Sequence, residues 1–198
     1  MKNCTLLTLL FLLTGFSATS QVFSLLKDIN ESPQSFSTGS YPGEMVIMNG
    51  ILFFTATTTN AGTELWKSDG TNTGTTIIKD IYPGIQSSSP TNLTVVNGLI
   101  YFYALDPIHG RELWKTDGTA QGTQLIKDIY PGIESGPAGK ILALNNATFF
   151  AASDGINGRE LWKTDGTADG TVMVKDFVPG RISSTPNLQL GLNGWVYF

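Results

Sequence analysis

An eight-residue phrase, Glu-Leu-Trp-Lys-Ser/Thr-Asp-Gly-Thr, occurs three times in this chain. The copies cover residues 64–71, 112–119 and 160–167, so each begins 48 residues after the one before it. A fixed period of this length is typical of one supersecondary unit that is copied in tandem. The repeat therefore constrains the architecture more strongly than any single residue does, and it says much less about function.

Each repeat predicts four antiparallel strands. In the second copy, residues 92–96 and 99–105 are β-branched or aromatic runs joined by Asn97-Gly98, a strong signal for a tight hairpin. Residues 111–116 and 124–129 form a second pair around a glycine-rich turn. The return loop at 130–138 contains proline and glycine, which end strands. No stretch has helical periodicity.

These patterns predict an all-β chain, a β-propeller-like array of four-stranded antiparallel blades that forms an incomplete ring. Strands that are apolar at nearly every position, as at 99–103, favour blades buried on both faces. A β-solenoid is the alternative, but its coils are shorter and parallel. We expect a leading outer strand at 22–29, blades at about 40–81, 90–129 and 138–177, and a partial blade at 186–198. This unfinished order predicts a fragment of a longer repeat protein.

The symmetry of the second hairpin in each repeat predicts its register. In the first copy Glu64 lies opposite Lys79, Leu65 opposite Ile78 and Trp66 opposite Ile77. The equivalent pairs in the later copies are Glu112–Lys127, Trp114–Leu125, Glu160–Lys175 and Trp162–Met173. The Glu–Lys pairs predict a structural ladder of opposite charges across the strands.

Residues 1–20 have the pattern of a signal peptide. Lys2 precedes an apolar run at 6–16, and Ala18-Thr19-Ser20 offers small residues before a cut at Gln21. The sequence therefore predicts an exported protein, extracellular or on a cell surface. No later segment is long and apolar enough to predict a transmembrane span.

Charge and cysteine content exclude several functions. Cys4, the one cysteine, lies in the predicted signal peptide, so the mature chain has no disulfide and no thiolate metal site. The formal net charge is −4, and the basic residues are spread through the repeats. Nucleic acid and anionic membranes are therefore not expected partners.

The repeated phrase, with a second Gly-Thr and a Lys-Asp pair after it, resembles the bacterial ELWxxDGT repeat family. The resemblance covers nearly all of residues 22–198. It implies an exported, multi-copy surface protein, often a substrate of type IX secretion, with no established catalytic activity. The first copy departs from the later ones at Thr63 and Ser68, where they have arginine and threonine.

Two sets of signature residues have both a functional and a structural interpretation. Asp69, Asp117 and Asp165 could bind calcium, but an aspartate before glycine commonly bonds the amides of its own turn, and we favour that role. Trp66, Trp114 and Trp162 could stack on sugars, but their mid-strand position favours packing between blades. Glu64, Glu112 and Glu160 complete the structural signature. No cofactor is predicted.

The loops between the second and third strand of each repeat vary in sequence. Variable loops on a rigid scaffold commonly carry binding, and the candidate ligand-facing residues are Asn60, Asp106, His109, Arg111, Asp154, Asn157 and Arg159. Asp154, Asn157 and Glu160 could share a cation. The two arginines could recognise carboxylates, but pairing with Asp106 or Asp154 is the plainer interpretation. His109 is the one histidine, which argues against a histidine-based site.

The sequence favours a non-catalytic, exported interaction or adhesion scaffold that binds a surface protein or glycan through its blade-connecting loops. The alternative is an accessory or catalytic propeller of a secreted, carbohydrate-active enzyme. A structural spacer is a third interpretation. Because fold does not determine function, the preference for a non-catalytic scaffold rests on the family resemblance and on the similarity of the repeat copies to one another.

Overall fold

The computed structural model describes residues 26–29 and 39–198. This part of the chain is all-β and contains no helix. The predicted signal peptide at 1–20 lies outside the described residues, as do residues 22–25 of the predicted leading strand. Residues 26–29 are described and form no strand, and the leading outer strand at 22–29 stays a prediction.

Three four-stranded sheets follow one another, each with its strands in sequence order. The first contains β1 (Gly43–Met48), β2 (Ile51–Thr58), β3 (Gly62–Ser68) and β4 (Thr76–Lys79). The second contains β5 (Thr91–Val96), β6 (Leu99–Asp106), β7 (Gly110–Thr116) and β8 (Gln124–Lys127). The third contains β9 (Pro137–Leu144), β10 (Ala147–Ala152), β11 (Glu160–Thr164) and β12 (Val172–Lys175). A hairpin of β13 (Leu190–Leu192) and β14 (Trp195–Tyr197) comes last.

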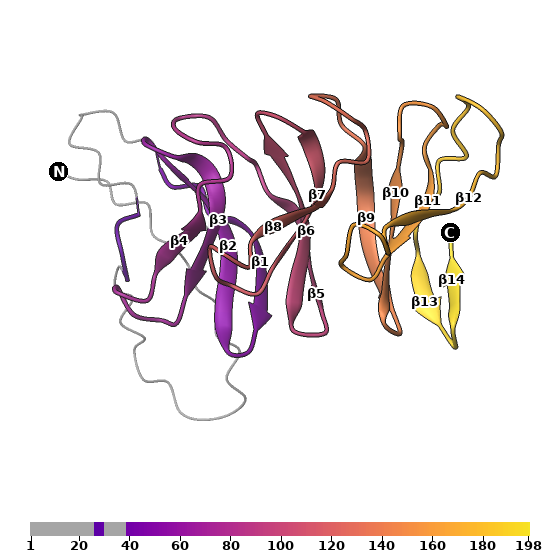
Figure 1. Cartoon of the computed structure of the whole chain (residues 1–198). Helices are drawn as coiled ribbons and strands as arrows, with labels where there is room; N and C mark the ends of the chain where they lie inside the picture. The colour runs from indigo at the N-terminus through magenta and orange to yellow at the C-terminus, as the bar shows by residue number, and fades with distance from the viewer. Residues whose placement is uncertain (1–25, 30–38) are drawn as a thin grey trace.

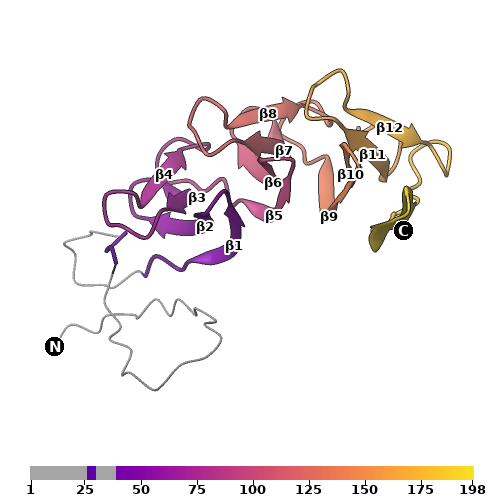
Figure 2. The ribbon, with the colours of Figure 1, turned by 90° about the horizontal axis from the view of Figure 1, so that it is seen from below.

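The sheets stand side by side in an open, curved row (Figure 1). Seen from below, β1, β5 and β9 line the concave side, and β4, β8 and β12 lie on the convex side (Figure 2). The first strands touch in series, because β1 contacts β5, β5 contacts β9 and β9 contacts β13. The prediction of consecutive four-stranded antiparallel units is therefore confirmed for three units, and the fourth is a two-stranded hairpin.

The Asn-Gly turns between the first two strands adopt the predicted conformation. Asn97 and Gly98 have φ angles of 50° and 76°, and Asn49-Gly50 and Asn193-Gly194 repeat these positive values. Asparagine and glycine tolerate the left-handed region, whose twist matches that of the adjoining strands. These turns fix which face each side chain of the first two strands occupies.

The register of the second hairpin agrees with the prediction at the tryptophan and differs one step later. Trp66 pairs with Ile77, as expected, but Lys79 pairs with Leu65 instead of Glu64. A β-bulge between Leu65 and Trp66 gives β4 one extra residue there. The same shift occurs in the other two sheets, so the predicted Glu–Lys ladder is wrong in all three.

The hydrophobic core lies between the sheets. One cluster joins Phe53, Leu65 and Ile78 of the first sheet to Phe102 and Trp114 of the second. A second cluster joins the equivalent residues of the second sheet to those of the third. Each interface is thus built from the same repeat positions, which explains the fully apolar strands of the sequence.

Candidate functional site

The connections alternate between two ends of the sheets. Because neighbouring strands are antiparallel, the loops β2–β3, β6–β7 and β10–β11 lie at the same end as the return loops β4–β5, β8–β9 and β12–β13. We call this the loop-bearing end; it lies at the upper edge of the row (Figure 1). The Asn-Gly and Asp-Gly-Thr turns lie at the opposite end.

A buried glutamate in each repeat holds the return loop at this end. Glu64, fully buried in β3, accepts hydrogen bonds from the amides of Ile81 (3.2 Å) and Ser88 (2.9 Å) and from the Ser88 hydroxyl (2.5 Å). Burial raises the pKa of Glu64, and the hydrogen bonds from Ser88 and the loop amides oppose that rise. A buried carboxylate must be satisfied in this way, so the return loop closes over it.

The third repeat copies this arrangement. Glu160 accepts from the amides of Phe177 (3.1 Å) and Ser184 (3.0 Å) and from the Ser184 hydroxyl (2.6 Å). The glutamate of the repeated phrase is therefore a loop anchor. This role was not predicted from the sequence because the donors are backbone amides 17 to 24 residues away, and no residue type marks them.

The middle repeat lacks one part of the anchor. Gly136 stands where the other copies have Ser88 and Ser184, so no hydroxyl reaches Glu112. The Tyr130 amide donates to Glu112 Oε1 (3.0 Å), whereas Oε2 is buried without a partner. Burial, with a smaller contribution from the charge of Asp128, raises the pKa of Glu112 to about 8.

The loop-bearing end also requires glycine at the start of the third strand. A Cβ on Gly62 would lie 2.0 Å from the carbonyl oxygen of Gln86, and one on Gly110 would lie 2.0 Å from that of Glu134. Both glycines have positive φ. The backbone of the return loop therefore packs directly on the β2–β3 and β6–β7 loops, and only glycine leaves room for it.

The candidate residues of the β6–β7 loop mainly hold the loop itself. Asp106 accepts from the amides of Ile108 (2.8 Å) and His109 (2.6 Å) and pairs with His109 Nδ1 (2.8 Å). Burial raises the pKa of Asp106, but these hydrogen bonds outweigh it and leave the pKa below its usual value. Arg111 donates to the Ser89 carbonyl and to Thr91 Oγ1, not to Asp106.

The β10–β11 loop has a similar cap. Asp154 accepts from the amides of Ile156 and Asn157 and from Asn157 Nδ2 (2.9 Å), and these bonds lower its pKa against the effect of burial. Among the described residues the one ion pair joins His109 and Asp106, so the predicted arginine–aspartate pairs are absent there. Arg159 is partly exposed, and Asn60 is exposed in the first copy.

Exposed isoleucines are a feature of this end that was not predicted from the sequence. Five lie on its loops, each with two thirds or more of its surface in solvent, and they are Ile85, Ile108, Ile133, Ile156 and Ile182. Isolated exposed apolar residues are common, but repeated ones on neighbouring loops are typical of interaction sites. The repeat spacing of Ile108 and Ile156, and of Ile85 and Ile133, was the available signal.

The signature aspartates lie at the opposite end and hold their own turns. Asp117 Oδ1 accepts from the amide (2.8 Å) and the hydroxyl (2.7 Å) of Thr119. A Cβ on Gly122 would lie 2.1 Å from the same oxygen. The hydrogen bonds from Thr119 lower the pKa of Asp117. Asp69 and Asp165 repeat these bonds with Thr71 and Thr167.

The signature tryptophans are enclosed. Trp66, Trp114 and Trp162 are 6–7% exposed, so their rings do not face solvent where a sugar could stack. The ammonium of Lys79, in the first sheet, lies 5.8 Å from the ring centroid of Trp114 in the second. This contact belongs to the interface between sheets, in line with a packing role for the tryptophan.

Lysines of the third and fourth strands also join neighbouring sheets. Lys67 Nζ donates to the carbonyl of Gly118 (2.8 Å), and Lys79 Nζ donates to that of Thr123 (2.8 Å). Lys115 and Lys127 make the same two bonds to Gly166 and Thr171 of the third sheet. A shallow pocket of about 430 Å³ lies between the first two sheets beside Lys67 and the Asp69 and Asp117 turns.

The described part of the chain holds neither a metal-binding cluster nor a membrane-spanning helix. Within residues 26–29 and 39–198, no three histidine, cysteine, aspartate or glutamate side chains gather in a way that could hold a metal ion. The same residues include no helix with the length and apolarity needed to cross a bilayer.

Comparison with known proteins adds little to this description. No protein-family model matches the chain, and no curated protein matches it. Among solved structures, the computationally designed Ika8 protein is similar with 18% sequence identity and a TM-score of 0.41. The match covers 77% of this chain and 41% of that protein, so the chain spans less than half the length of the designed protein.

Proposed function

We propose that the chain is an exported, non-catalytic interaction scaffold of ELWxxDGT repeats, built as part of a β-propeller and placed on a bacterial surface. Its binding surface is the loop-bearing end, and its partner is a surface protein or glycan. The single observation that carries the proposal is the set of five exposed isoleucines on its loops, where buried glutamates hold the return loops and Asp106 and Asp154 hold the loops before the third strands.

The scaffold supports this role through preorganisation. Each glutamate fixes a return loop to the third strand, so the exposed residues of the loop are presented on a rigid base. A rigid surface loses little conformational entropy on binding, which favours affinity. The sheets that stand face to face, with their first strands in contact along the concave side, support the propeller as the parent architecture.

A catalytic propeller is less well supported by the same residues. Glu112 has the raised pKa of a general acid, but it is fully buried and no substrate can reach it. Glu64 and Glu160 are also fully buried and are occupied by loop amides. A carboxylate pair for glycoside hydrolysis must flank an accessible bond, and these three do not.

Binding to intact bacterial cells tests the proposal. Fluorescently labelled protein is mixed with cells and bound fluorescence is measured by flow cytometry for the wild type, Ile108→Asp and Ile156→Asp. We expect saturable binding that each substitution reduces by about tenfold or more, since a buried charge opposes an apolar contact.

Ile47→Asp is the matched control. Ile47 is 70% exposed, close to the 67% of Ile108 and 72% of Ile156, and lies on β1 near the opposite end. It should leave cell binding unchanged. An equal loss in all three variants, or no saturable binding by the wild type, would contradict the proposal, and release of product from chromogenic glycosides would favour the enzyme instead.

A further inference from the structure

The pocket between the first two sheets is lined by side chains from both of them. Its volume is about 430 Å³, within the range of ~300–1,000 Å³ that is common for small-molecule sites. Ile51 and Phe53 of β2 make its apolar part, and the polar part comes from Lys67 and from the Asp69 and Asp117 turns. These turns lie at the end of the sheets opposite to the loop-bearing end, so the pocket belongs to a different surface.

The two aspartates supply hydrogen-bond acceptors to the pocket. Asp69 Oδ1 accepts from the amide (2.8 Å) and the hydroxyl (2.7 Å) of Thr71, and Asp117 Oδ1 accepts the same two bonds from Thr119. Among the described residues, none donates to Oδ2 of either carboxylate from another position. The hydrogen bonds from the threonines lower the pKa of both aspartates, so both are ionised near neutral pH and each has one oxygen to offer a ligand.

A lysine and two threonines supply donors to the same space. The ammonium of Lys67 has three donors and gives one of them to the carbonyl of Gly118 (2.8 Å). Thr73 and Thr76 also line the pocket, and a hydroxyl can donate or accept. The pocket therefore presents donors and acceptors together, beside an apolar surface.

The equivalent space between the second and third sheets contains an additional hydroxyl. Tyr101 stands at the repeat position of Phe53. A Cβ on Gly166 would lie 2.6 Å from the Tyr101 hydroxyl oxygen, which therefore lies against the Asp165 turn. Phe53 approaches the equivalent Gly118 with its ring alone, since a Cβ there would lie 2.9 Å from Phe53 Cζ. The first interface keeps the room that this hydroxyl occupies in the second.

Two further positions are also smaller in the first interface. Gln121 replaces Thr73 in the turn of the second sheet, and Gln124 replaces Thr76. The two glutamines contact each other, because Gln124 Nε2 donates to the carbonyl of Gln121 (2.9 Å). The pocket is thus a feature of the first interface that the repeated phrase does not specify.

We propose that this pocket binds one pyranose unit of a neutral saccharide. Sugar hydroxyls both donate and accept, so neighbouring hydroxyls of one ring can serve the two Oδ2 acceptors and the Lys67 ammonium together. The C–H groups of the ring contact Ile51 and Phe53. An anionic ligand would face two carboxylates and a cationic ligand would face the ammonium, so a neutral ligand fits the charges best. The site stands independently of the function proposed above.

The probes are the methyl glycosides of glucose, galactose, mannose and N-acetylglucosamine. Each is titrated up to about 50 mM into the isotope-labelled full chain, and amide shifts are followed by NMR. We expect saturable binding of at least one probe with a millimolar Kd. The largest shifts should lie at Gly74, Gly118 and Thr119, which line the pocket.

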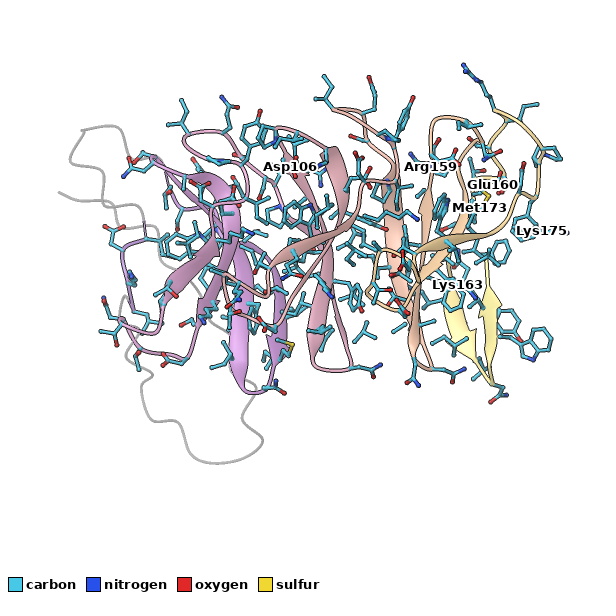
Figure 3. The ribbon with its side chains drawn as sticks, in the orientation of Figure 1. Asp106, Arg159, Glu160, Lys163, Met173 and Lys175 are labelled. Atoms are coloured by element: carbon cyan, nitrogen blue, oxygen red, sulfur yellow. The ribbon has the colours of Figure 1, made fainter. Side chains whose placement is uncertain are left out.

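Two variants and a matched control connect this binding to the pocket. Asp69→Asn keeps the Oδ1 acceptor but turns Oδ2 into a donor, and Phe53→Tyr introduces the hydroxyl that Tyr101 has in the second interface. Each should weaken binding about tenfold or more. Asp165→Asn makes the same change in the turn that follows Lys163 of the third sheet (Figure 3), away from the pocket, and should bind like the wild type.

Three results would overturn the proposal. One is the absence of saturation by every probe, and another is wild-type affinity in both pocket variants. The third is an equal loss in Asp165→Asn, which would assign the effect to the folding of the turns. Circular dichroism melting checks that the variants fold, and Phe53→Tyr keeps the test valid if Asp69→Asn does not.

Discussion

The middle sheet, β5–β8, and the last four-stranded sheet, β9–β12, contain the same repeated phrase but have different surroundings. The middle sheet is covered on both faces, and its Ile126 and Ile129 are buried. The last sheet is covered by a complete sheet on one face only, and the equivalent Val174 and Phe177 are exposed. The phrase therefore determines the sheet and its turns, whereas burial of the fourth strand depends on the next repeat.

The two sheets also differ at the return-loop anchor. In the last sheet Glu160 accepts the Ser184 hydroxyl, whereas in the middle sheet Gly136 leaves Glu112 Oε2 unpaired. A single residue outside the repeated phrase thus changes the hydrogen bonding of a residue inside it. Equivalent return loops in the two sheets are therefore held by glutamates that have different hydrogen-bond partners.

The largest expected difference in stability is between a variant that loses an enclosed tryptophan and one that loses an exposed tryptophan. Trp114 is 6% exposed in the middle sheet, so Trp114→Ala should lower the free energy of unfolding by about 3–5 kcal/mol. Trp195, 71% exposed in the last hairpin, should cost less than about 0.5 kcal/mol. Urea unfolding of both variants measures the difference. Similar losses would show that the two regions are not packed as described.

Glutamine substitution compares the two anchors directly. Both carboxylate oxygens of Glu160 accept hydrogen bonds. In Glu160→Gln the side-chain NH2 group would therefore face a donor, and the free energy of unfolding should fall by about 1.5–3 kcal/mol. Glu112 meets fewer donors and is protonated near neutral pH, so Glu112→Gln should be nearly neutral at pH 7. Equal losses in thermal unfolding would contradict the difference between the anchors.

Gly136→Ser should supply the missing hydroxyl and change the pH dependence of stability. Between about pH 4.5 and 8 the folded chain keeps a proton on Glu112 that the unfolded chain releases, so stability falls as the pH rises through this window. A hydroxyl that donates to the carboxylate lowers its pKa and should flatten that fall.

The melting temperature at pH 5, 6.5 and 8 measures this effect. Serine at this site is crowded, since its Cβ would lie 3.0 Å from Glu112 Oε1 and from the Ser153 carbonyl, but Ser88 and Ser184 occupy the same repeat position. Ser88→Gly is the reciprocal control: it removes a hydrogen bond that lowers the raised pKa of Glu64, so it should steepen the fall. An unchanged slope in both variants would remove Glu112 as its cause.

The smallest expected effect concerns calcium. Asp117 and Asp165 already accept hydrogen bonds from their own turns through one oxygen each, and calcium needs six to eight oxygen ligands. The melting temperature should therefore be the same in millimolar calcium and in excess chelator. A rise with calcium that Asp117→Ala removes would assign the turns a metal-binding role.

The sequence predicted the elements that depend on local chemistry. The Asn-Gly hairpins and the four strands of each unit follow from turn residues and apolar runs, and the tryptophan register follows from hairpin symmetry. The Glu–Lys register was wrong because a β-bulge shifts the pairing at Leu65, and no residue there marks a bulge. The glutamate anchor was missed because its donors are distant backbone amides.

The candidate site was only partly predictable for the same reason. The variable loops were located correctly between the second and third strands, but Asp106 and Asp154 hold those loops through local hydrogen bonds. The exposure of Ile108 and Ile156 is a property of the tertiary structure, which no local sequence pattern specifies. Their ligand-facing role stays a prediction.

Native-state hydrogen exchange at the return loops tests most directly whether the buried glutamates hold the loop-bearing end in place. We expect the amides of Ile81 and Ser88 to be protected as strongly as strand amides in the wild type. In Glu64→Ala these two amides should lose protection while the Glu160-bound amides of Phe177 and Ser184 keep theirs. Return-loop amides that exchange freely in the wild type, or stay protected in Glu64→Ala, would contradict this role of the glutamates.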